Sequence, residues 1–406
     1  MNYFFSQLRF VKMKDILACF TFIAALPVSW IYKRKRPNLW LVCERGDEAR
    51  DNGYWFYKYL REKHPEQDCV YALKRSSADY QKVSKIPGEI IEFGTFKHWV
   101  YYLTAEINIS SQKEGKPNAA VCHLLEIYGI RKNKRVYLKH GIVKDDLKWH
   151  YYDVMKVWLY TCGAKREYDY VKEKFGYSDK VAVLTGLSRY DNLNDSILDK
   201  KTVLIIPTSR EWLARPINDY LKYDDIKHFE NTEYYKNWMR LLKNQKFNET
   251  ISSYGLHVVF FLHPNMQKYA SYFTDLSANI EIATNKMYDL QMLMKKAGCM
   301  ITDYSSVYFD FAYMRKPLIY FQFDYEKYRE GHYQEGYFSY INDGFGPVCK
   351  DADTLVERFV TMVENNFCMD SLYEGRVNSF FAFSDNNNCQ RIYDAICKRN
   401  SGRDNA

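Results

Sequence analysis

The sequence predicts an α/β protein built from two doubly wound parallel sheets. From about residue 38 onward, short apolar runs alternate with segments of helical periodicity. The apolar runs are continuous rather than alternating, which is typical of strands that are covered on both faces. The same alternation occurs a second time after a join near residues 192–201, so the 406 residues divide into two domains of ordinary size.

The first half contains the runs that we expect to form one sheet. They are Leu39–Glu44, Cys69–Leu73, Ile90–Gly94, Ile107–Ser111, Arg135–Gly141, Val157–Gly163 and Lys180–Gly186. After the first run, Asp51–Lys63 carries an apolar stripe at Tyr54, Tyr57 and Leu60, which predicts a helix.

The second half repeats this arrangement. The expected strands are Thr202–Arg210, His257–Pro264, Ile280–Thr284, Cys299–Asp303 and Pro317–Phe321. Helical periodicity marks Tyr234–Asn244 and Met287–Ala297, and the tail from Asp351 to about Lys398 also has a helical pattern. We therefore expect domains at 37–195 and 196–350, followed by C-terminal helices over 351–406.

Residues 1–36 form a separate hydrophobic and basic segment. Ile16–Ile31 contains no charged residue, and Lys12, Lys14 and the Lys33–Arg36 cluster flank it. The stretch is short for a spanning helix, which needs about 20 residues, and Pro27 interrupts it. We expect it to associate with anionic lipid at the cytoplasmic face of the membrane. A first buried helix of the globular domain is the alternative.

Composition narrows the class of protein. The ten cysteines form no C-x-x-C pair and several lie in apolar runs, which favours reduced thiols over a disulfide framework or a zinc site. The net charge of +8 is compatible with anionic partners, but no basic stripe with interleaved aromatics predicts nucleic-acid binding. No acidic cluster with metal-ligand spacing occurs. We expect no cofactor, although an anionic partner could carry Mg²⁺.

Polar side chains that can bind phosphate or move protons follow several expected strands. In open α/β sheets, ligands bind beyond the carboxyl ends of the strands. The residues found there are Lys139–Gly141, Gly186–Asp191, Pro207–Arg210, His263–Pro264 and Asp303–Ser306. One such end would be weak evidence, because loops are polar. Together they supply two imidazoles, guanidinium groups and hydroxyls, which suits a phosphate-handling site.

Longer stretches around these strand ends resemble one family. They are Glu44–Leu60, Leu138–Gly141, Val183–Leu193, Pro207–Arg210, Phe261–Pro264, Ile301–Tyr328 and Gly344–Val348. The set resembles the CDP-glycerol glycerophosphotransferases, the teichoic-acid primases and polymerases, and its Ile301–Tyr328 block is highly specific. The family usually has Trp before the first His and Thr-Pro after its Gly. Here Lys139 precedes His140, and Ile142 and Val143 follow Gly141.

The resemblance implies a GT-B-like fold with two facing Rossmann-like domains, the first on the acceptor side and the second binding CDP-glycerol. It implies transfer of glycerol phosphate to a hydroxyl of a lipid-linked or polymeric glycan, with release of CMP, in teichoic-acid-like or capsular polymer synthesis. By position, His140 and His263 match the two catalytic histidines. The matched binding positions are Gly141, Arg189, Pro207, Thr208, Arg210, Ser305, Ser306 and Asp310.

Three alternatives to this activity remain open from the sequence. The same fold can serve a glycosyltransferase that uses a nucleotide sugar, or a sugar-nucleotide epimerase. A CDP-ribitol-dependent ribitol-phosphate transferase has the same chemistry with another alcohol. A non-enzymatic polysaccharide-assembly protein is the third.

The corner "ITDYSS" (Ile301–Ser306) has two interpretations. Ser305 or Ser306 can cap the following helix by accepting a backbone N–H. The same position can bind a phosphate at the helix start, with Asp310 contacting the polar end of the donor. Asp303 is expected to brace the loop.

Overall fold

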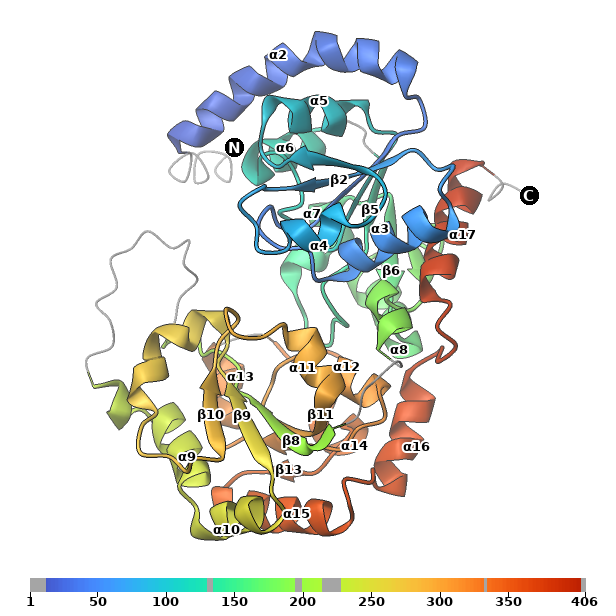
Figure 1. The fold of residues 1–406 in the computed structure, drawn as a ribbon. Coiled ribbons are helices and arrows are strands. Elements are labelled where there is room, and N and C mark those ends of the chain that lie inside the picture. The colour runs from blue at the N-terminus through green and yellow to red at the C-terminus, as the bar shows by residue number, and fades with distance from the viewer. Residues whose placement is uncertain (1–11, 130–133, 194–198, 214–227, 332–333, 403–406) are drawn as a thin grey trace. The chain divides into compact units, whose positions relative to one another are not determined.

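The protein consists of two α/β units, each built on a fully parallel sheet (Figure 1). The computed structural model describes residues 12–129, 134–193, 199–213, 228–331 and 334–402. Unit 1 comprises 1–142, 148–191 and 385–406, and unit 2 comprises 143–147 and 192–384. The expected domain boundary at 195/196 lies outside the described residues.

Unit 1 contains a seven-stranded sheet in the order β3-β2-β1-β4-β5-β6-β7. The strands are β1 (Trp40–Cys43), β2 (Cys69–Leu73), β3 (Glu89–Glu92), β4 (Ile107–Ser110), β5 (Lys134–Tyr137), β6 (Leu159–Cys162) and β7 (Ala182–Leu184). Its helices are α2 (Met13–Lys35), α3 (Asn52–Lys63), α4 (Tyr80–Ser84), α5 (Phe96–Thr104), α6 (Ala119–Ile127), α7 (Tyr152–Met155), α8 (Lys165–Phe175) and α17 (Asn388–Asn400).

Unit 2 contains a six-stranded sheet in the order β10-β9-β8-β11-β12-β13. The strands are β8 (Asp199–Ile206), β9 (His257–Phe261), β10 (Ile280–Ala283), β11 (Ala297–Thr302), β12 (Leu318–Phe321) and β13 (Val348–Cys349). Its helices are α9 (Glu233–Leu242), α10 (Gln245–Ser253), α11 (Leu290–Lys296), α12 (Tyr308–Tyr313), α13 (Tyr325–Gly331), α14 (Tyr340–Asp343), α15 (Ala352–Glu364) and α16 (Ser371–Phe380).

Every strand that the apolar runs predict is present. Central strands such as β1 and β11 are buried along their whole length, whereas β3 and β5 are mostly half-buried. The short edge strand β13 was not predicted, since two residues carry no periodicity. The expected helix at Met287–Ala297 begins later, at Leu290, where Asp289 caps it by accepting from Gln291 N at 2.9 Å. Ala297 already belongs to β11.

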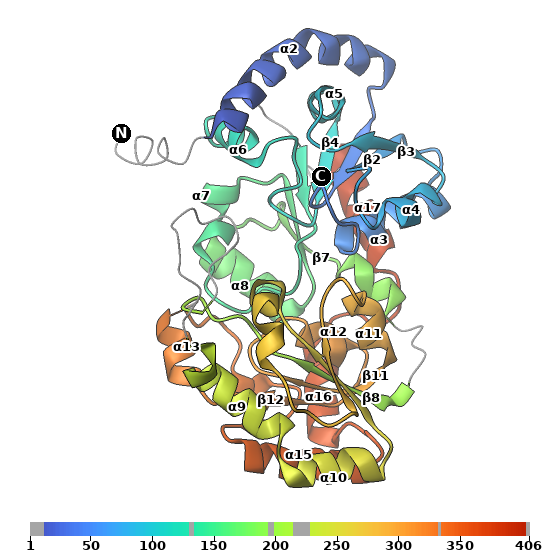
Figure 2. The ribbon, with the colours of Figure 1, turned by 60° about the vertical axis from the view of Figure 1, so that its left-hand side comes forward.

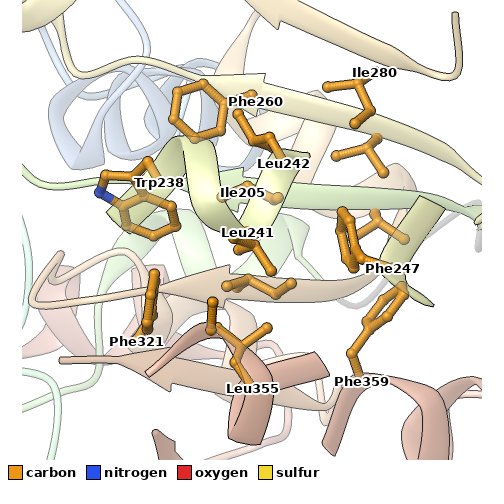
Figure 3. Packing of buried hydrophobic residues seen from close by; sticks show 14 of the residues in the cluster. Ile205, Trp238, Leu241, Leu242, Phe247, Phe260, Ile280, Phe321, Leu355 and Phe359 are labelled. Atoms are coloured by element: carbon orange, nitrogen blue, oxygen red, sulfur yellow. The ribbon is translucent and has the colours of Figure 1, made fainter. Parts of the chain in front are cut away.

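The core of unit 2 shows how the helices close the sheet. Figure 3 shows Phe260 of β9 beside Trp238 of α9, and Ile205 of β8 and Phe359 of α15 belong to the same cluster. All four are completely buried. Such a core holds the strand ends in fixed positions, which is what a binding site on those ends requires.

Helix α2 packs along unit 1 and runs without a break through Pro27. In both views α2 lies over α5 (Figures 1 and 2). Phe22 contacts Trp99 with ring centroids 5.7 Å apart, and Tyr32 contacts Tyr101 at 5.8 Å. The opposite face of α2 is exposed and apolar. The expectation that Pro27 interrupts the segment is therefore wrong for the helix itself.

Candidate active site

The candidate site of unit 1 lies where its strand order reverses. β1 pairs with both β2 and β4, so the chain winds outward in both directions from the β1–β4 pair. This reversal opens a crevice at the carboxyl ends of the strands, where open α/β sheets bind ligands. Glu44 follows β1, Gln112 follows β4 and His140 follows β5.

His140 and Asp51 form a hydrogen-bonded pair at this edge. His140 Nδ1 lies 2.6 Å from Asp51 Oδ2, and the Nε2 of Gln112 donates to the same oxygen at 2.9 Å. Because the Asp51 carboxylate can only accept, Nδ1 carries a proton, and in the neutral form of the ring Nε2 keeps its lone pair. The His140 side chain is 67% exposed, whereas that of Asp51 is 9% exposed. His140 therefore presents a basic nitrogen to incoming molecules from a buried anchor.

The anchor is fixed by the start of α3 and by the loop after β7. Asp51 is the N-cap of α3 and accepts from Asn52 N at 2.7 Å. Arg189 Nη1 donates to Asp51 Oδ1 at 2.8 Å and also to the carbonyl of His140. Asn52 Nδ2 donates to the carbonyl of Lys139 at 2.8 Å, which ties the histidine loop to the helix.

Lys139 turns the chain just before His140. Its φ of 62° lies in the left-handed region, which costs a residue other than glycine roughly 1–2 kcal/mol. The side chain is buried, and its Nζ donates to Glu167 Oε1 in an ion pair. Glu167 Oε2 in turn accepts from Gly163 N at 2.7 Å. This pair holds the strained turn and hence the direction of His140.

The charges around His140 tune its basicity. The Asp51 carboxylate raises the pKa of His140 above its ordinary value, against the opposing effect of desolvation. Burial alone would raise the pKa of Asp51, but His140, Arg189 and the Asn52 amide together hold it below its usual value. By contrast, burial lowers the pKa of His98 and His150 to about 3, so these stay neutral.

Glu44 holds the backbone at the start of α3, next to Asp51. It is completely buried and accepts from the backbone N–H groups of Arg50, Asp51 and Tyr54, the last at 2.7 Å. Gly53 makes room for it, because a Cβ there would lie 2.9 Å from Glu44 Cγ. Burial and the nearby Asp51 charge raise the pKa of Glu44 to about 8.

Unit 2 has an equivalent reversal between β8 and β11. Pro207 and Thr208 follow β8, His263 follows β9, and Ser305 and Ser306 follow β11. His263 is half-buried, and its Nδ1 accepts from Asn265 N at 3.2 Å. Its proton is therefore on Nε2, the opposite tautomer to that of His140. His263 is thus arranged to donate a hydrogen bond and His140 to accept a proton.

The structure gives Arg210 a different role from the expected donor contact. Its side chain is completely buried and forms a bidentate pair with Asp324, with Nε–Oδ2 at 2.7 Å and Nη2–Oδ1 at 3.0 Å. Nη2 also lies 2.8 Å from Asp303 Oδ2. Asp303 accepts from Thr208 N at 2.8 Å, which agrees with its expected bracing role. Arg210 holds the two loops together from inside, because its guanidinium has no route to a ligand.

The remaining predicted positions differ in exposure. Ser305 and Ser306 are half-buried. The N-cap of α12 is Val307, with no side-chain cap, so the expectation that a serine hydroxyl caps this helix is wrong. Asp310 is 2% exposed within α12, and its expected contact with the donor stays a prediction. The hydroxyl of Thr208 is buried and has no partner among the described residues.

Two residues of the candidate site, Asp51 and Gln112, were not predicted from the sequence. Asp51 is 89 residues from His140 in the chain, and Gln112 is 28 residues from it. The available signal was the position of Asp51 directly before a predicted helix, inside one of the family-like stretches. Arg189 was expected to bind the donor. In the structure it is buried and donates to Asp51 and to the His140 carbonyl.

Two doubly wound parallel sheets, each with polar residues at its reversal point, define an α/β protein of the GT-B type. Solved structures of similar fold agree. The wall teichoic acid polymerase TagF, as a single-residue variant, matches with a TM-score of 0.66 and 14% identity over 97% of this chain and 100% of that one. The S. aureus MnaA–UDP co-structure matches with a TM-score of 0.55 and 14% identity over 90% of this chain and 97% of that one.

Sequence comparison is more specific than the fold. The model of the family described as CDP-Glycerol:Poly(glycerophosphate) glycerophosphotransferase matches residues 24–398. The chain belongs to this family. The minor teichoic acid biosynthesis protein GgaB of Bacillus subtilis (strain 168) is 32% identical over 92% of this chain and 41% of its own length. The teichoic acid glycerol-phosphate primase of the same organism is 26% identical over 58% of this chain and 56% of its own length. The chain thus spans only part of these curated relatives.

Proposed function

We propose that the protein transfers glycerol phosphate from CDP-glycerol to a hydroxyl of a lipid-linked or polymeric glycan and releases CMP. The observation that carries this proposal is the His140–Asp51 pair at the sheet edge of unit 1, in which the His140 side chain is exposed and its Nδ1 lies against a buried carboxylate. Family membership supports the donor, since the family is described by CDP-glycerol and glycerophosphate transfer.

The chemical step is an in-line displacement at the β-phosphorus. The acceptor oxygen forms a bond to this phosphorus, and the bond from the phosphorus to the bridging oxygen of CMP breaks. The acceptor proton moves to Nε2 of His140, a contribution typically worth about 10² to 10⁴ in rate. Asp51 stabilises the imidazolium that forms, and Arg189 keeps Asp51 and the His140 carbonyl in place.

The donor would be held by unit 2. His263 can donate from Nε2 to a phosphate oxygen, and the hydroxyls of Thr208, Ser305 and Ser306 provide further donors at neighbouring strand ends. Such groups stabilise the charge that develops on the transferring phosphoryl group and on CMP. Arg210 contributes indirectly, because it fixes the loops that carry these residues.

Release of CMP from the purified chain tests the activity. CDP-glycerol, CDP-ribitol and UDP-sugars are supplied separately, with and without lipid-linked glycan acceptors. We expect CMP from CDP-glycerol, and we expect His140→Ala to lose most of it while the matched change His257→Ala does not. His257 is 47% exposed on β9 and lies outside the proposed site. Consumption of a UDP-sugar alone, or full activity of His140→Ala, contradicts the proposal.

We further propose that α2 lies on the cytoplasmic surface of the membrane rather than across it. Helix α2 is 23 residues long and apolar enough to cross a bilayer by composition. Contacts with the protein nevertheless run from its first turn to its last, from Asp15, which accepts from Asn118 at 2.8 Å, to Tyr32. The exposed face carries Leu17, Phe20, Ile23 and Trp30, and basic residues flank it at both ends.

Vesicle flotation tests this arrangement. The chain should bind vesicles that contain anionic lipid, and Phe20→Glu should reduce the bound fraction. Leu372→Glu is the matched control, because Leu372 is 57% exposed on α16 in unit 2. Equal binding of the two variants contradicts a role for the α2 face. Protection of the helix from protease on both sides of a sealed vesicle contradicts the surface position.

A further inference from the structure

A cavity of ≈ 320 Å³ lies in unit 1 beside the His140–Asp51 pair. Strands β4 and β5, the start of α6 and the segment 149–157 line it. Gln112 lines this cavity and also contacts the His140–Asp51 pair. Its Nε2 lies 2.9 Å from Asp51 Oδ2 and 3.0 Å from His140 Nδ1. A molecule in this cavity is therefore within one side chain of the proposed base.

The cavity wall offers a flat aromatic surface. Trp149 is 40% exposed, and Tyr137 lines the same space. Lys113 Nζ lies 5.9 Å from the centroid of the Trp149 ring, and the Lys113 side chain is 65% exposed. Flat aromatic rings at a partly polar opening suit ligands that have one apolar face and polar edges.

The wall also holds a hydrogen-bond acceptor that lacks a donor. Asn108 is 8% exposed, and its Nδ2 donates to the Tyr102 carbonyl at 3.3 Å. Its Oδ1 has no partner among the described residues. A buried acceptor left without a partner costs about 1–3 kcal/mol. An O–H or N–H donor from a ligand would satisfy the Asn108 oxygen.

Pairing of the two largely buried cations in the cavity wall disfavours a purely anionic ligand there, while a third cation of the wall, Lys113, is exposed. Lys116 and Arg135 both line the cavity, but Glu126 holds them, with Oε2 at 2.6 Å from Lys116 Nζ and at 2.9 Å from Arg135 Nη1. A hydrocarbon chain is disfavoured as well, because it would leave Asn108 Oδ1 unsatisfied. A pyranose ring meets both requirements, since its C–H face packs on an aromatic ring and its hydroxyls donate to an amide oxygen.

We propose that this cavity binds one pyranose ring of the acceptor glycan and places the receiving hydroxyl near His140. This inference rests on the proposed transferase function. The cavity is at the lower end of the ~300–1,000 Å³ typical of small-molecule sites, which fits one ring rather than a chain. Gln112 then links occupancy of the cavity to the base, because this residue lines the cavity and its amide contacts the His140–Asp51 pair.

Ligand-observed NMR on the full chain tests the site without relying on catalysis. The compounds are methyl β-D-glucopyranoside and its 2-acetamido derivative, with sn-glycerol 3-phosphate and farnesyl phosphate as the competing chemistries. We expect saturable pyranoside binding that Trp149→Ala and Asn108→Leu each weaken about tenfold, the value of one lost hydrogen bond or stacking contact. Trp30→Ala is the matched control, because Trp30 is 60% exposed on α2 and should leave binding unchanged.

The outcomes separate this inference from the proposed function. Absence of pyranoside binding, binding of only glycerol 3-phosphate or farnesyl phosphate, or unchanged binding in both variants overturns the inference. If Asn108→Leu does not fold, the binding measurements on Asn108→Ser and Trp149→Ala test the inference instead. Trp149 is already exposed, so its replacement should not prevent folding. CMP release from CDP-glycerol by the unaltered chain is measured in parallel. Release with unaffected pyranoside binding in the variants overturns only the cavity assignment, whereas binding without any release overturns only the transferase function.

Discussion

Arg210 provides a quantitative test of how unit 2 holds its ligand-binding loops. Replacement of Arg210 by Ala removes the cation that pairs with Asp303 at 2.8 Å and with Asp324 at 2.7 Å. It also removes the donor to the Thr208 carbonyl, at 2.7 Å from Nη1. Two buried carboxylates then remain without a cation, at a position where the guanidinium carbon lay 4.9 Å from the Tyr304 ring centroid and 5.2 Å from that of Tyr328.

The magnitude follows from the burial of all partners. The Arg210 and Asp303 side chains are 0% exposed and that of Asp324 is 3% exposed, so water cannot replace the lost interactions. Removal of one partner from a buried ion pair destabilises a protein by about 3–5 kcal/mol. We expect a loss of this size in the free energy of unfolding of unit 2, and about 1 kcal/mol or less from an exposed pair. Lys296→Ala is the control that breaks an exposed pair, because Lys296 is 59% exposed and lies 3.7 Å from Asp199.

Urea denaturation combined with hydrogen exchange of the β8 and β11 amides measures this loss within unit 2. The variant should also depend on pH. Burial already holds the pKa of Asp303 above its ordinary value, and the Arg210 guanidinium opposes this effect. Without the guanidinium the pKa of Asp303 should rise further, so the folded variant binds a proton there more tightly than the unfolded chain does. Its free energy of unfolding should therefore fall as pH increases through the shifted range. A loss no larger than that of Lys296→Ala, with no such pH dependence, refutes the bracing role of Arg210.

Three further changes test the site in unit 1. Asp51→Asn removes the largest cause of the raised pKa of His140, so the acid limb of the pH profile for CMP release should move to lower pH, with a rate loss of about 10²-fold or more. Gly186→Ala should destabilise unit 1 by roughly 1–3 kcal/mol in thermal or urea unfolding, because φ is +78° and a Cβ would lie 1.7 Å from Asn388 Oδ1. Glu44→Gln should flatten the decrease in unfolding free energy between pH 4.5 and about 8, since the folded form of Glu44 holds its proton over that range.

Matched variants isolate each effect. Asp47→Asn makes the same charge change on an exposed side chain and should leave the acid limb in place. Gly176→Ala has the same φ of +78° but open space around the Cβ, so it measures backbone strain without the clash. If the two glycine variants lose equal stability, the contact with Asn388 is unimportant. If Asp51→Asn leaves both the rate and the acid limb unchanged, Asp51 does not control His140.

The sequence was most informative about the strands and the ends of the strands. Continuous apolar runs such as Cys69–Leu73 identify buried strands because burial on both faces leaves no polar alternation. His140 and His263 could be found from their positions after such runs. The partner of His140 could not be predicted in this way, because Asp51 is brought close to His140 only by the pairing of β1, β4 and β5.

The role of a charged strand-end residue was the least predictable feature. Arg189 and Arg210 look alike in sequence, as cations that follow strands and suit phosphate. In the structure each is bonded to carboxylates from distant segments, Arg189 to Asp51 and Arg210 to Asp303 and Asp324. Which cations a protein neutralises internally depends on side chains that are brought together only by the fold. Ser305 and Ser306 show the same limit, since the start of α12 at Tyr308 leaves their hydroxyls out of the cap.

The buried pair of Lys139 and Glu167 has a consequence for how such chains diverge. Loss of Lys139 alone strands a buried carboxylate, and loss of Glu167 alone strands a buried ammonium and the Gly163 N–H. Either single replacement passes through a destabilised form, so the two positions should be inherited as a unit. In relatives with Trp before the first His, we expect an uncharged residue, such as Gln, at the position of Glu167. The residues at positions 139 and 167 should therefore change together among relatives, although neither takes part in the proposed reaction.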